Sequence, residues 1–529
     1  MKKTIRIIAF VLCLIMVMLT AACGDKGDTA SSGDKTSSAQ SQSAVTPTVK
    51  GTYFDTDIWV PVPMISQALI DAGYENSEAC QACPYVILDP IEGKLGFYAI
   101  DVGGMYRTTD GGKSWSPCTI GFNAAGATGF AIDPNNTSRV IAIGCNSGYD
   151  KKNGIALSVD GGQTWADKYL PGDEGFDGQI GIHNDFRVQV AFDETSKSEK
   201  IGGSAVVYWS REDFTGDANR SGNLNKPALY KSEDGGETWK KLAGTEKYAG
   251  GEIFVNAKNG KVIATNKKGA WVSADGGKSW KQVSDLAFNT TYYVRTKPDN
   301  VYGLTNDGLY VSTDFGGNFK KVESDSFPAD NTDFNDNLRV APSNPNHMIM
   351  FWKGTGHDYQ YKTYFTKDGG KTWTESKQDK RGIWIPLSSW RSTFCYSPVD
   401  ENYIIANEYR SEDGGANFFV STKGFNAICT GGKFSININD DRLMSLGSQD
   451  FNGGFSTDYG KTWTYVNWSG VAWGGFTYGA YCLTDKIAVT TNATGWSGGG
   501  EIVYTLDGGK TIQHTGLNIT GRPAGYGSG

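Results

Sequence analysis

The stretch "TTDGGKSW" (Thr108–Trp115) joins an aspartate, two glycines and a closing tryptophan, and variants of it recur along the chain. The further copies are SVDGGQTW (158–165), SEDGGETW (232–239), SADGGKSW (273–280), STDFGGNF (312–319), TKDGGKTW (366–373), SEDGGANF (411–418), STDYGKTW (456–463) and TLDGGKTI (505–512). Their aspartates run from Asp110 to Asp507, which gives a mean period of about 50 residues. A fixed period of this length indicates a repeat architecture.

Each copy is typical of a tight turn between two β-strands. The carboxylate can accept backbone N–H groups, the glycines can take a positive φ, and the closing aromatic can pack under the turn. Short alternating segments such as 104–107, 227–231 and 308–311 precede the copies, so that about four strands fit into each period. This Asp-box pattern predicts an all-β chain, a β-propeller of about nine four-stranded blades, in which the nine repeated aspartates are structural.

One aspartate lies outside the repeat. Asp101, in "AIDVGGMYR" (99–107), stands nine residues before Asp110, and the matching positions of the other copies hold no acid. A similar arrangement occurs in "SQDFNGGFSTDYGKTW" (448–463), where Asp450 precedes Gly-Gly and then a copy of the repeat. Asp101 belongs to the first copy and Asp450 to the eighth, so seven blades separate them, and seven is a common number of blades in a closed propeller ring. We therefore predict a first seven-bladed propeller over 51–425 and the start of a second over 426–529, with C-terminal truncation or one large ring as the open alternatives.

With these residues the chain resembles glycoside hydrolase family 74, the xyloglucanases. "YAIDVGGMYR" (98–107) is similar to the first-blade signature of that family, and "LGSQDFNGGF" (446–455) is similar to its second-site motif. The resemblance implies two seven-bladed propellers and inverting hydrolysis of the β-1,4-glucan backbone of xyloglucan. It assigns Asp101 as general base and Asp450 as general acid, and it makes Tyr106 and Arg107 candidates for substrate binding.

This chemistry has further requirements. Inversion needs two carboxylates roughly 6.5–9.5 Å apart, and the one that acts as the acid needs a raised pKa. Trp468 and Trp473, in "NWSGVAWGG" (467–475), could form a wall on which sugar rings stack. Packing in the protein core explains each of these two tryptophans equally well. We expect neither a cofactor nor a metal.

Two other classes of Asp-box protein can be weighed against this prediction. Sialidases bind the substrate carboxylate with three arginines, one of them before the first box, but this chain has no arginine between Cys23 and Tyr106. That absence argues against a sialidase. A non-catalytic propeller, either sortilin-like or a glycan-binding lipoprotein of the cell surface, stays open as the alternative function.

The N-terminus predicts export. Three basic residues in the first six positions, an apolar run over 7–19 and small residues before Cys23 form a lipoprotein signal peptide over 1–22. We expect Cys23 to carry the lipid, 23–50 to be a disordered tether, and the protein to sit on the extracellular face of the bacterial cell membrane. The net charge of −7 and the absence of basic clusters argue against nucleic acid as partner. The expected partners are a polysaccharide substrate and the membrane, with the protein itself a monomer.

Overall fold

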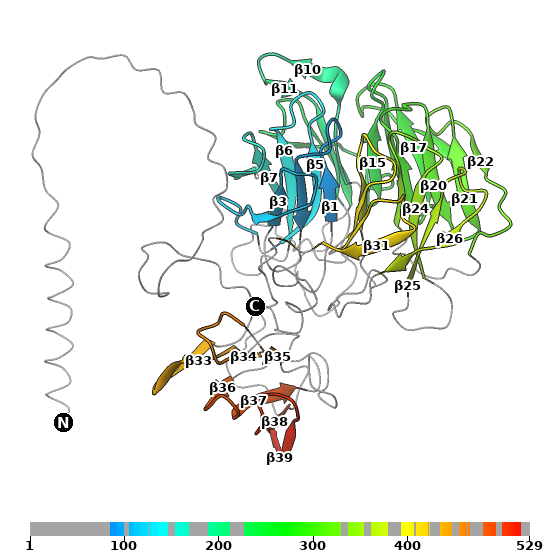
Figure 1. The fold of residues 1–529 in the computed structure, drawn as a ribbon. Coiled ribbons are helices and arrows are strands. Elements are labelled where there is room, and N and C mark those ends of the chain that lie inside the picture. The colour runs from blue at the N-terminus through cyan, green and yellow to red at the C-terminus, as the bar shows by residue number, and fades with distance from the viewer. Residues whose placement is uncertain are drawn as a thin grey trace, which may run out of the picture. The chain divides into compact units, whose positions relative to one another are not determined.

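The structure, a computed structural model, describes residues 85–99, 105–124, 126–145, 154–168, 189–211, 227–328, 337–353, 361–378, 393–406, 409–421, 423, 434–446, 454–462, 464–465, 480–493 and 500–519. These residues form thirty-nine strands and one 3-10 turn, η1 (Glu194–Ser196). Within these ranges no helix has the length and apolar character needed to cross a membrane. The prediction of an all-β chain is confirmed (Figure 1).

The first four sheets follow one another along the chain. Sheet 1 contains β1 (Tyr85–Leu88), β2 (Gly96–Ala99), β3 (Met105–Thr108) and β4 (Ser116–Pro117). Sheet 2 contains β5 (Gly126–Ile132), β6 (Val140–Cys145), β7 (Ile155–Ser158) and β8 (Ala166–Lys168). Sheet 3 contains β9 (Val190–Phe192), β12 (Val207–Arg211), β13 (Ala228–Ser232) and β14 (Lys240–Lys241), and carries an inserted hairpin of β10 (Lys197–Ser198) and β11 (Gly203–Ser204). Sheet 4 contains β15 (Glu252–Val255), β16 (Val262–Asn266), β17 (Gly269–Ser273) and β18 (Lys281–Ser284).

Three further sheets continue the same antiparallel order. Sheet 5 contains β19 (Thr290–Tyr293), β20 (Val301–Thr305), β21 (Gly308–Ser312) and β22 (Phe319–Lys321). Sheet 6 contains β23 (Asn337–Val340), β24 (Met348–Lys353), β25 (Tyr361–Thr366) and β26 (Thr374–Glu375). Sheet 7 contains β28 (Phe394–Tyr396), β29 (Ile404–Ala406), β30 (Tyr409–Ser411) and β31 (Asn417–Val420), and β27 (Lys377–Gln378) pairs in parallel with β31.

Two sheets lie in the C-terminal part of the chain. Sheet 8 contains β32 (Phe434–Asn437), β33 (Asp440–Leu446), β34 (Gly454–Ser456) and β35 (Thr464–Tyr465). Sheet 9 contains β36 (Ala480–Cys482), β37 (Ala488–Ala493), β38 (Gly500–Thr505) and β39 (Gln513–Ile519). They pack against each other around a small core of Leu443, Phe455, Cys482, Ala488 and Val503.

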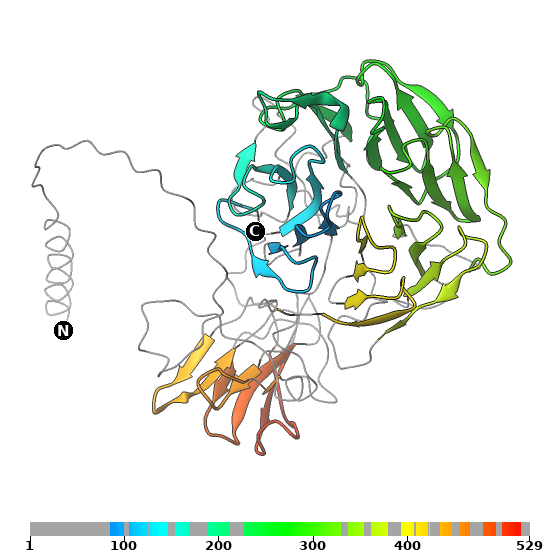
Figure 2. The same cartoon turned by 45° about the horizontal axis from the view of Figure 1, so that its top comes forward.

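Sheets 1 to 7 close into a ring. Their first strands contact one another in chain order, and the first strand of sheet 7, β28, also contacts β1 of sheet 1. Figure 2 shows these sheets, coloured from blue to yellow, standing around a common centre. This arrangement is that of a β-propeller with seven sheets before sheet 8 begins. The predicted domain limits, 51–425 and 426–529, stay predictions.

No strand of sheet 1 pairs with a strand of sheet 7 in the described residues, so turns and side chains close the ring there. The N–H of Leu88 donates to Sγ of Cys395 at 3.2 Å. The hydroxyl of Tyr403 donates to the carbonyl oxygen of Gly111 at 2.8 Å. These contacts join residues about 300 positions apart in the chain.

The nine box turns share one hydrogen-bonded arrangement, which Asp275 illustrates. Its Oδ1 accepts from the hydroxyl of Ser273 and from the N–H of Ser279, both at 2.9 Å. Its Oδ2 accepts from the Ser279 hydroxyl at 2.6 Å, and the Ser273 hydroxyl accepts from the N–H of Gly277 at 2.8 Å. The same four bonds recur in the other eight turns. Each turn joins the third strand of its sheet to the outermost strand, so the prediction that these aspartates are structural is confirmed.

The hydrogen bonds favour the ionised carboxylate. The hydroxyl and then the amide of Ser279 lower the pKa of Asp275 to about 2. The corresponding groups of Thr511 lower the pKa of Asp507 to about 2. In the other seven turns burial raises the pKa, but the hydrogen bonds together outweigh it, and the pKa is lowered.

The second glycine of the box also holds neighbouring sheets together. Gly162 of sheet 2 has a φ of 81°, and a Cβ at this position would lie 2.2 Å from the Phe97 ring of sheet 1. Gly112 of sheet 1 has the same relation to Ile405 of sheet 7, again at 2.2 Å. Only glycine combines the positive φ with this close approach. The box therefore shapes its own turn and provides the surface on which the preceding sheet packs.

The buried hydroxyl of the box predicts a stability effect. Ser312 is fully buried and bridges Asp314 and the N–H of Gly316. Ser312→Ala leaves that N–H without an acceptor, so we expect a loss of about 1–2 kcal/mol in the free energy of unfolding. Urea unfolding followed by tryptophan fluorescence measures it. The exposed Ser138→Ala is the control, and equal midpoints for the two variants would contradict the assignment.

The lowered carboxyl pKa values predict how stability depends on pH. Because the pKa of Asp275 lies below the ordinary value near 4, its contribution to stability is fully present above about pH 4 and is lost as the pH falls through its folded pKa of about 2. The unfolding temperature of the wild type should therefore drop between pH 4.5 and 2.5, and that of Asp275→Asn should drop less. Parallel curves for the two proteins would show that this carboxylate is not stabilised by the turn.

Candidate functional site

Five of the predicted functional residues lie outside the described residues: Asp101, Asp450, Trp468, Trp473 and Cys23. The strands on either side nevertheless fix where the two aspartates stand in the topology. Asp101 falls between the end of β2 at Ala99 and the start of β3 at Met105, and Asp450 falls between the end of β33 at Leu446 and the start of β34 at Gly454. Both therefore belong to the connection between the second and third strands, in sheets 1 and 8.

This connection has a defined place relative to the box turn of its own sheet. Successive strands of each sheet are antiparallel, so the second-to-third connection lies at the opposite end of the strands from the third-to-fourth connection, which is the box. The box aspartates lie at one end, and the segments that carry Asp101 and Asp450 leave from the other.

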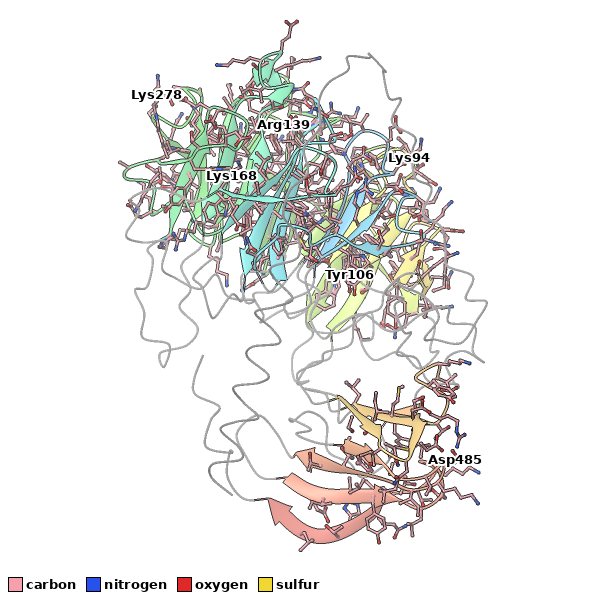
Figure 3. The ribbon with its side chains drawn as sticks, turned by 90° about the vertical axis from the view of Figure 1, so that its left-hand side faces the viewer. Lys94, Tyr106, Arg139, Lys168, Lys278 and Asp485 are labelled. Carbon is pink, nitrogen blue, oxygen red and sulfur yellow. The ribbon has the colours of Figure 1, made fainter. Side chains whose placement is uncertain are left out.

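Tyr106 and Arg107, in β3, belong to the described residues. Tyr106 is 2% exposed, lies opposite Tyr98 in the sheet, and packs against that ring with the centroids 6.4 Å apart. Tyr106 and Lys94 lie toward opposite ends of sheet 1 (Figure 3). Arg107 donates from Nε to the carbonyl oxygen of Gly161 in the box turn of sheet 2, at 2.5 Å. These contacts make both residues part of the scaffold of sheet 1, and their binding to a substrate stays a prediction.

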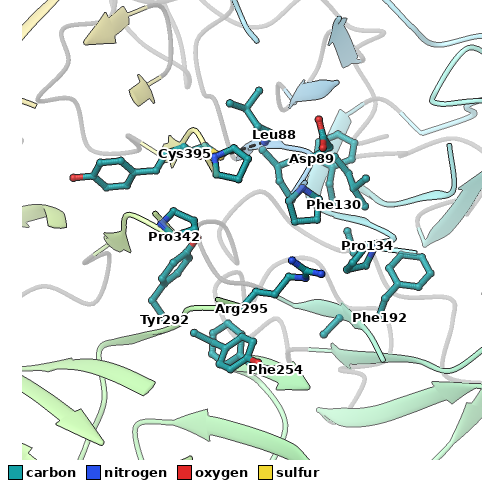
Figure 4. Close-up of a pocket in the computed structure, with 18 of the residues that line it drawn as sticks. Leu88, Asp89, Phe130, Pro134, Phe192, Phe254, Tyr292, Arg295, Pro342 and Cys395 are labelled. Carbon is teal, nitrogen blue, oxygen red and sulfur yellow. Dashed lines mark hydrogen bonds between the residues drawn. The ribbon is translucent and has the colours of Figure 1, made fainter. Parts of the chain in front are cut away.

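The described residues also enclose a cavity of about 210 Å³ at the centre of the ring, here called the channel cavity. All seven first strands contribute to its lining, which extends into the turns that follow them. Aromatic and proline side chains dominate the walls (Figure 4), among them Phe130, Phe192, Phe254, Pro134 and Pro342. The lining continues past the ends of the first strands, to the end of each sheet where the box turn also lies.

The two acids of the channel cavity are already engaged. Asp89 accepts four backbone N–H groups at 2.8–3.0 Å, from residues 91, 92, 94 and 95. Glu194 accepts from Nε of Arg295 at 2.5 Å. A pair of carboxylates arranged for hydrolysis needs one that can give a proton and one that can activate water. The channel cavity does not provide such a pair, and among the described residues no cluster of His, Cys, Asp or Glu could hold a metal ion.

Deeper in the channel cavity the polar groups are phenols, a thiol and a guanidinium. Arg339, only 3% exposed, lies over the rings of Tyr85 and Tyr292, 6.0 and 5.2 Å from their centroids. Burial raises the pKa of both tyrosines and raises the pKa of the Cys395 thiol to about 11. The two phenols and the thiol therefore stay in their neutral forms at neutral pH and are unsuited to nucleophilic catalysis.

The channel cavity was not predicted from the sequence. Its residues come from the first strand of seven different sheets and follow no repeated motif. A weak signal exists in the dipeptides Asp89-Pro90, Asp133-Pro134 and Ser397-Pro398, which each follow a short apolar strand.

Two protein families match segments of the chain. The BNR/Asp-box repeat matches residues 106–117, and the sortilin family (Sortilin-Vps10, sortilin and neurotensin receptor 3) matches residues 268–435. Both resemblances were predicted from the box copies.

Similar proteins include xyloglucanases. The chain is 30% identical to a xyloglucanase from Paenibacillus over 171 residues, which is 30% of this chain and 14% of that protein. It is 26% identical to a xyloglucanase from Acetivibrio thermocellus over 231 residues, which is 40% of this chain and 25% of that protein. The alignments thus span a quarter or less of the relatives' own lengths.

Solved structures agree on the fold. A GH74 enzyme from Niastella koreensis superposes with a TM-score of 0.53 at 17% identity, covering 83% of this chain and 73% of that one. The GH74 xyloglucanase from Xanthomonas campestris gives a TM-score of 0.52 at 16% identity, covering 83% of this chain and 80% of that one. The chain has an Asp-box β-propeller fold, similar to that of glycoside hydrolase family 74. The motif in residues 98–107 and the box repeats predicted this fold.

Proposed function

We propose that the protein is a glycoside hydrolase that cleaves the β-1,4-glucan backbone of a xyloglucan-type polysaccharide with inversion. The observation that carries the proposal is the position of Asp101 and Asp450. They fall on the same connection of two sheets, seven sheets apart, in a chain similar to xyloglucanases. They also stand apart from the box aspartates, whose oxygens are all engaged in turns.

In the proposed mechanism the two carboxylates act on opposite sides of one glycosidic bond. Asp101 is the general base that removes a proton from the attacking water, and Asp450 is the general acid that protonates the departing oxygen. Asp450 then needs a pKa above its ordinary value, which an apolar wall such as Trp468 and Trp473 could supply by desolvation. Arg107 joins β3 to the box turn of the next sheet.

A second candidate function is a propeller that binds a ligand without catalysis. The match of residues 268–435 to the sortilin family favours it. The two candidates differ in one observable property, since only the hydrolase releases new reducing ends from the polysaccharide.

Export to the cell surface is part of the proposal. It rests on the signal peptide over 1–22 and on Cys23 as the lipidated residue, with 23–50 as the tether. A lipid-anchored monomer outside the cell would meet polymers that cannot enter the cytoplasm.

The hydrolase proposal predicts a selective loss of activity. Asp101→Asn and Asp450→Asn each remove one proton-transferring group, so reducing-end release from xyloglucan should fall by roughly 10²–10⁴-fold. Both variants should unfold at the wild-type temperature, because neither residue belongs to a box turn.

The matched control is Asp160→Asn, which removes a carboxylate from a box turn. It should lower the unfolding temperature and leave the turnover of the folded protein near that of the wild type. Saturable xyloglucan binding by wild-type protein that releases no reducing ends would instead favour the binding function.

The export proposal predicts fatty-acid labelling at a single residue. Cells grown with an alkynyl palmitate should label the wild-type protein, and Cys23→Ser should abolish the label and release the protein into the medium. Equal labelling of the two proteins would refute the lipid anchor.

A further inference from the structure

We propose that the channel cavity is a binding site for a small, uncharged aromatic molecule that carries a hydrogen-bond acceptor. This site is separate from the proposed catalytic residues. The lining of the channel cavity extends into the turns that follow the first strands, whereas the segments that carry Asp101 and Asp450 leave from the other end of the strands.

The walls of the channel cavity favour an aromatic body. Phe130, Phe192 and Phe254 are buried in the inner strands and line it together with Tyr292. Its volume of about 210 Å³ is several times that of one water molecule, about 30 Å³ in the liquid. Water in an aromatic cavity finds few hydrogen-bond partners, so an apolar ligand gains free energy by displacing it.

Arg295 supplies donors at the opening. Its side chain extends between Tyr292 and Pro342 on one side and Pro134 and Phe192 on the other (Figure 4). Within the described residues its hydrogen bond to Glu194 uses Nε, so the Nη groups can donate to a ligand oxygen. This ion pair links the turn after β9 in sheet 3 to the turn after β19 in sheet 5 and so holds the guanidinium in place.

Charge balance argues for an uncharged ligand. Asp89 and Glu194 contribute two negative charges to the lining, and Arg295 and Arg339 contribute two positive ones. A charged ligand would leave this low-dielectric site with an unbalanced charge.

The test uses acedan, an uncharged naphthalene that carries a ketone and whose emission shifts to the blue in apolar surroundings. The wild type should bind one equivalent with a saturable blue shift. Arg295→Met should weaken binding by roughly tenfold, as expected for the loss of one hydrogen bond. Thr296→Trp places a large side chain at the exposed rim and should abolish binding.

The matched control is Arg442→Met, which breaks an exposed ion pair of sheet 8 and should bind acedan like the wild type. Asp101→Asn should also bind normally, so the result is independent of the proposed hydrolysis. A wild type without a saturable shift, or equal affinity in the wild type, Arg295→Met and Thr296→Trp, would overturn the proposal. Far-UV circular dichroism of each variant confirms that it is folded.

Discussion

The structure depends on one repeated interaction, the carboxylate that closes the box turn. Each box aspartate takes hydrogen bonds from two hydroxyl or amide side chains and from the backbone, and the buried hydroxyl before it accepts the N–H of the second glycine. That glycine packs against the preceding sheet, and at Gly112 and Gly162 a Cβ would lie only 2.2 Å from a side chain of that sheet. One motif therefore sets the hairpin and the spacing between sheets. Its repetition from sheet 1 to sheet 7 brings Gly112 against Ile405 and completes the ring.

The structural role of the box aspartates explains why the acids of the chain fall into two classes. A box carboxylate with a pKa near 2 and both oxygens engaged cannot serve as a general acid at neutral pH. Catalytic carboxyl groups therefore have to come from segments in which the carboxylate is not held by a box turn. The connections between the second and third strands are such segments, because they leave the sheets at the end away from the boxes and can vary without disturbing the ring.

Much of this was predictable from the sequence. The period of the boxes predicted the all-β propeller fold, because the turn needs the same few residue types every time. The hairpin β10–β11 and the parallel strand β27 were not predicted, since both lie in segments without the repeat. The channel cavity was missed for a related reason. Its lining is assembled from single residues of seven strands, which only the closed ring brings together. The distance between the carboxylates of Asp101 and Asp450 could not be predicted either, because both residues lie in segments that carry no repeat.

In the proposed function, two acids outside the repeat cleave a β-linked glucan with inversion. Proton NMR during the first minutes of the reaction can test for inversion, because the spectrum identifies the anomer that forms before mutarotation. Inversion by Asp101 and Asp450 predicts that new reducing ends from xyloglucan appear first as the α-anomer. First-formed β-anomer, or no new reducing ends at all, would contradict the account.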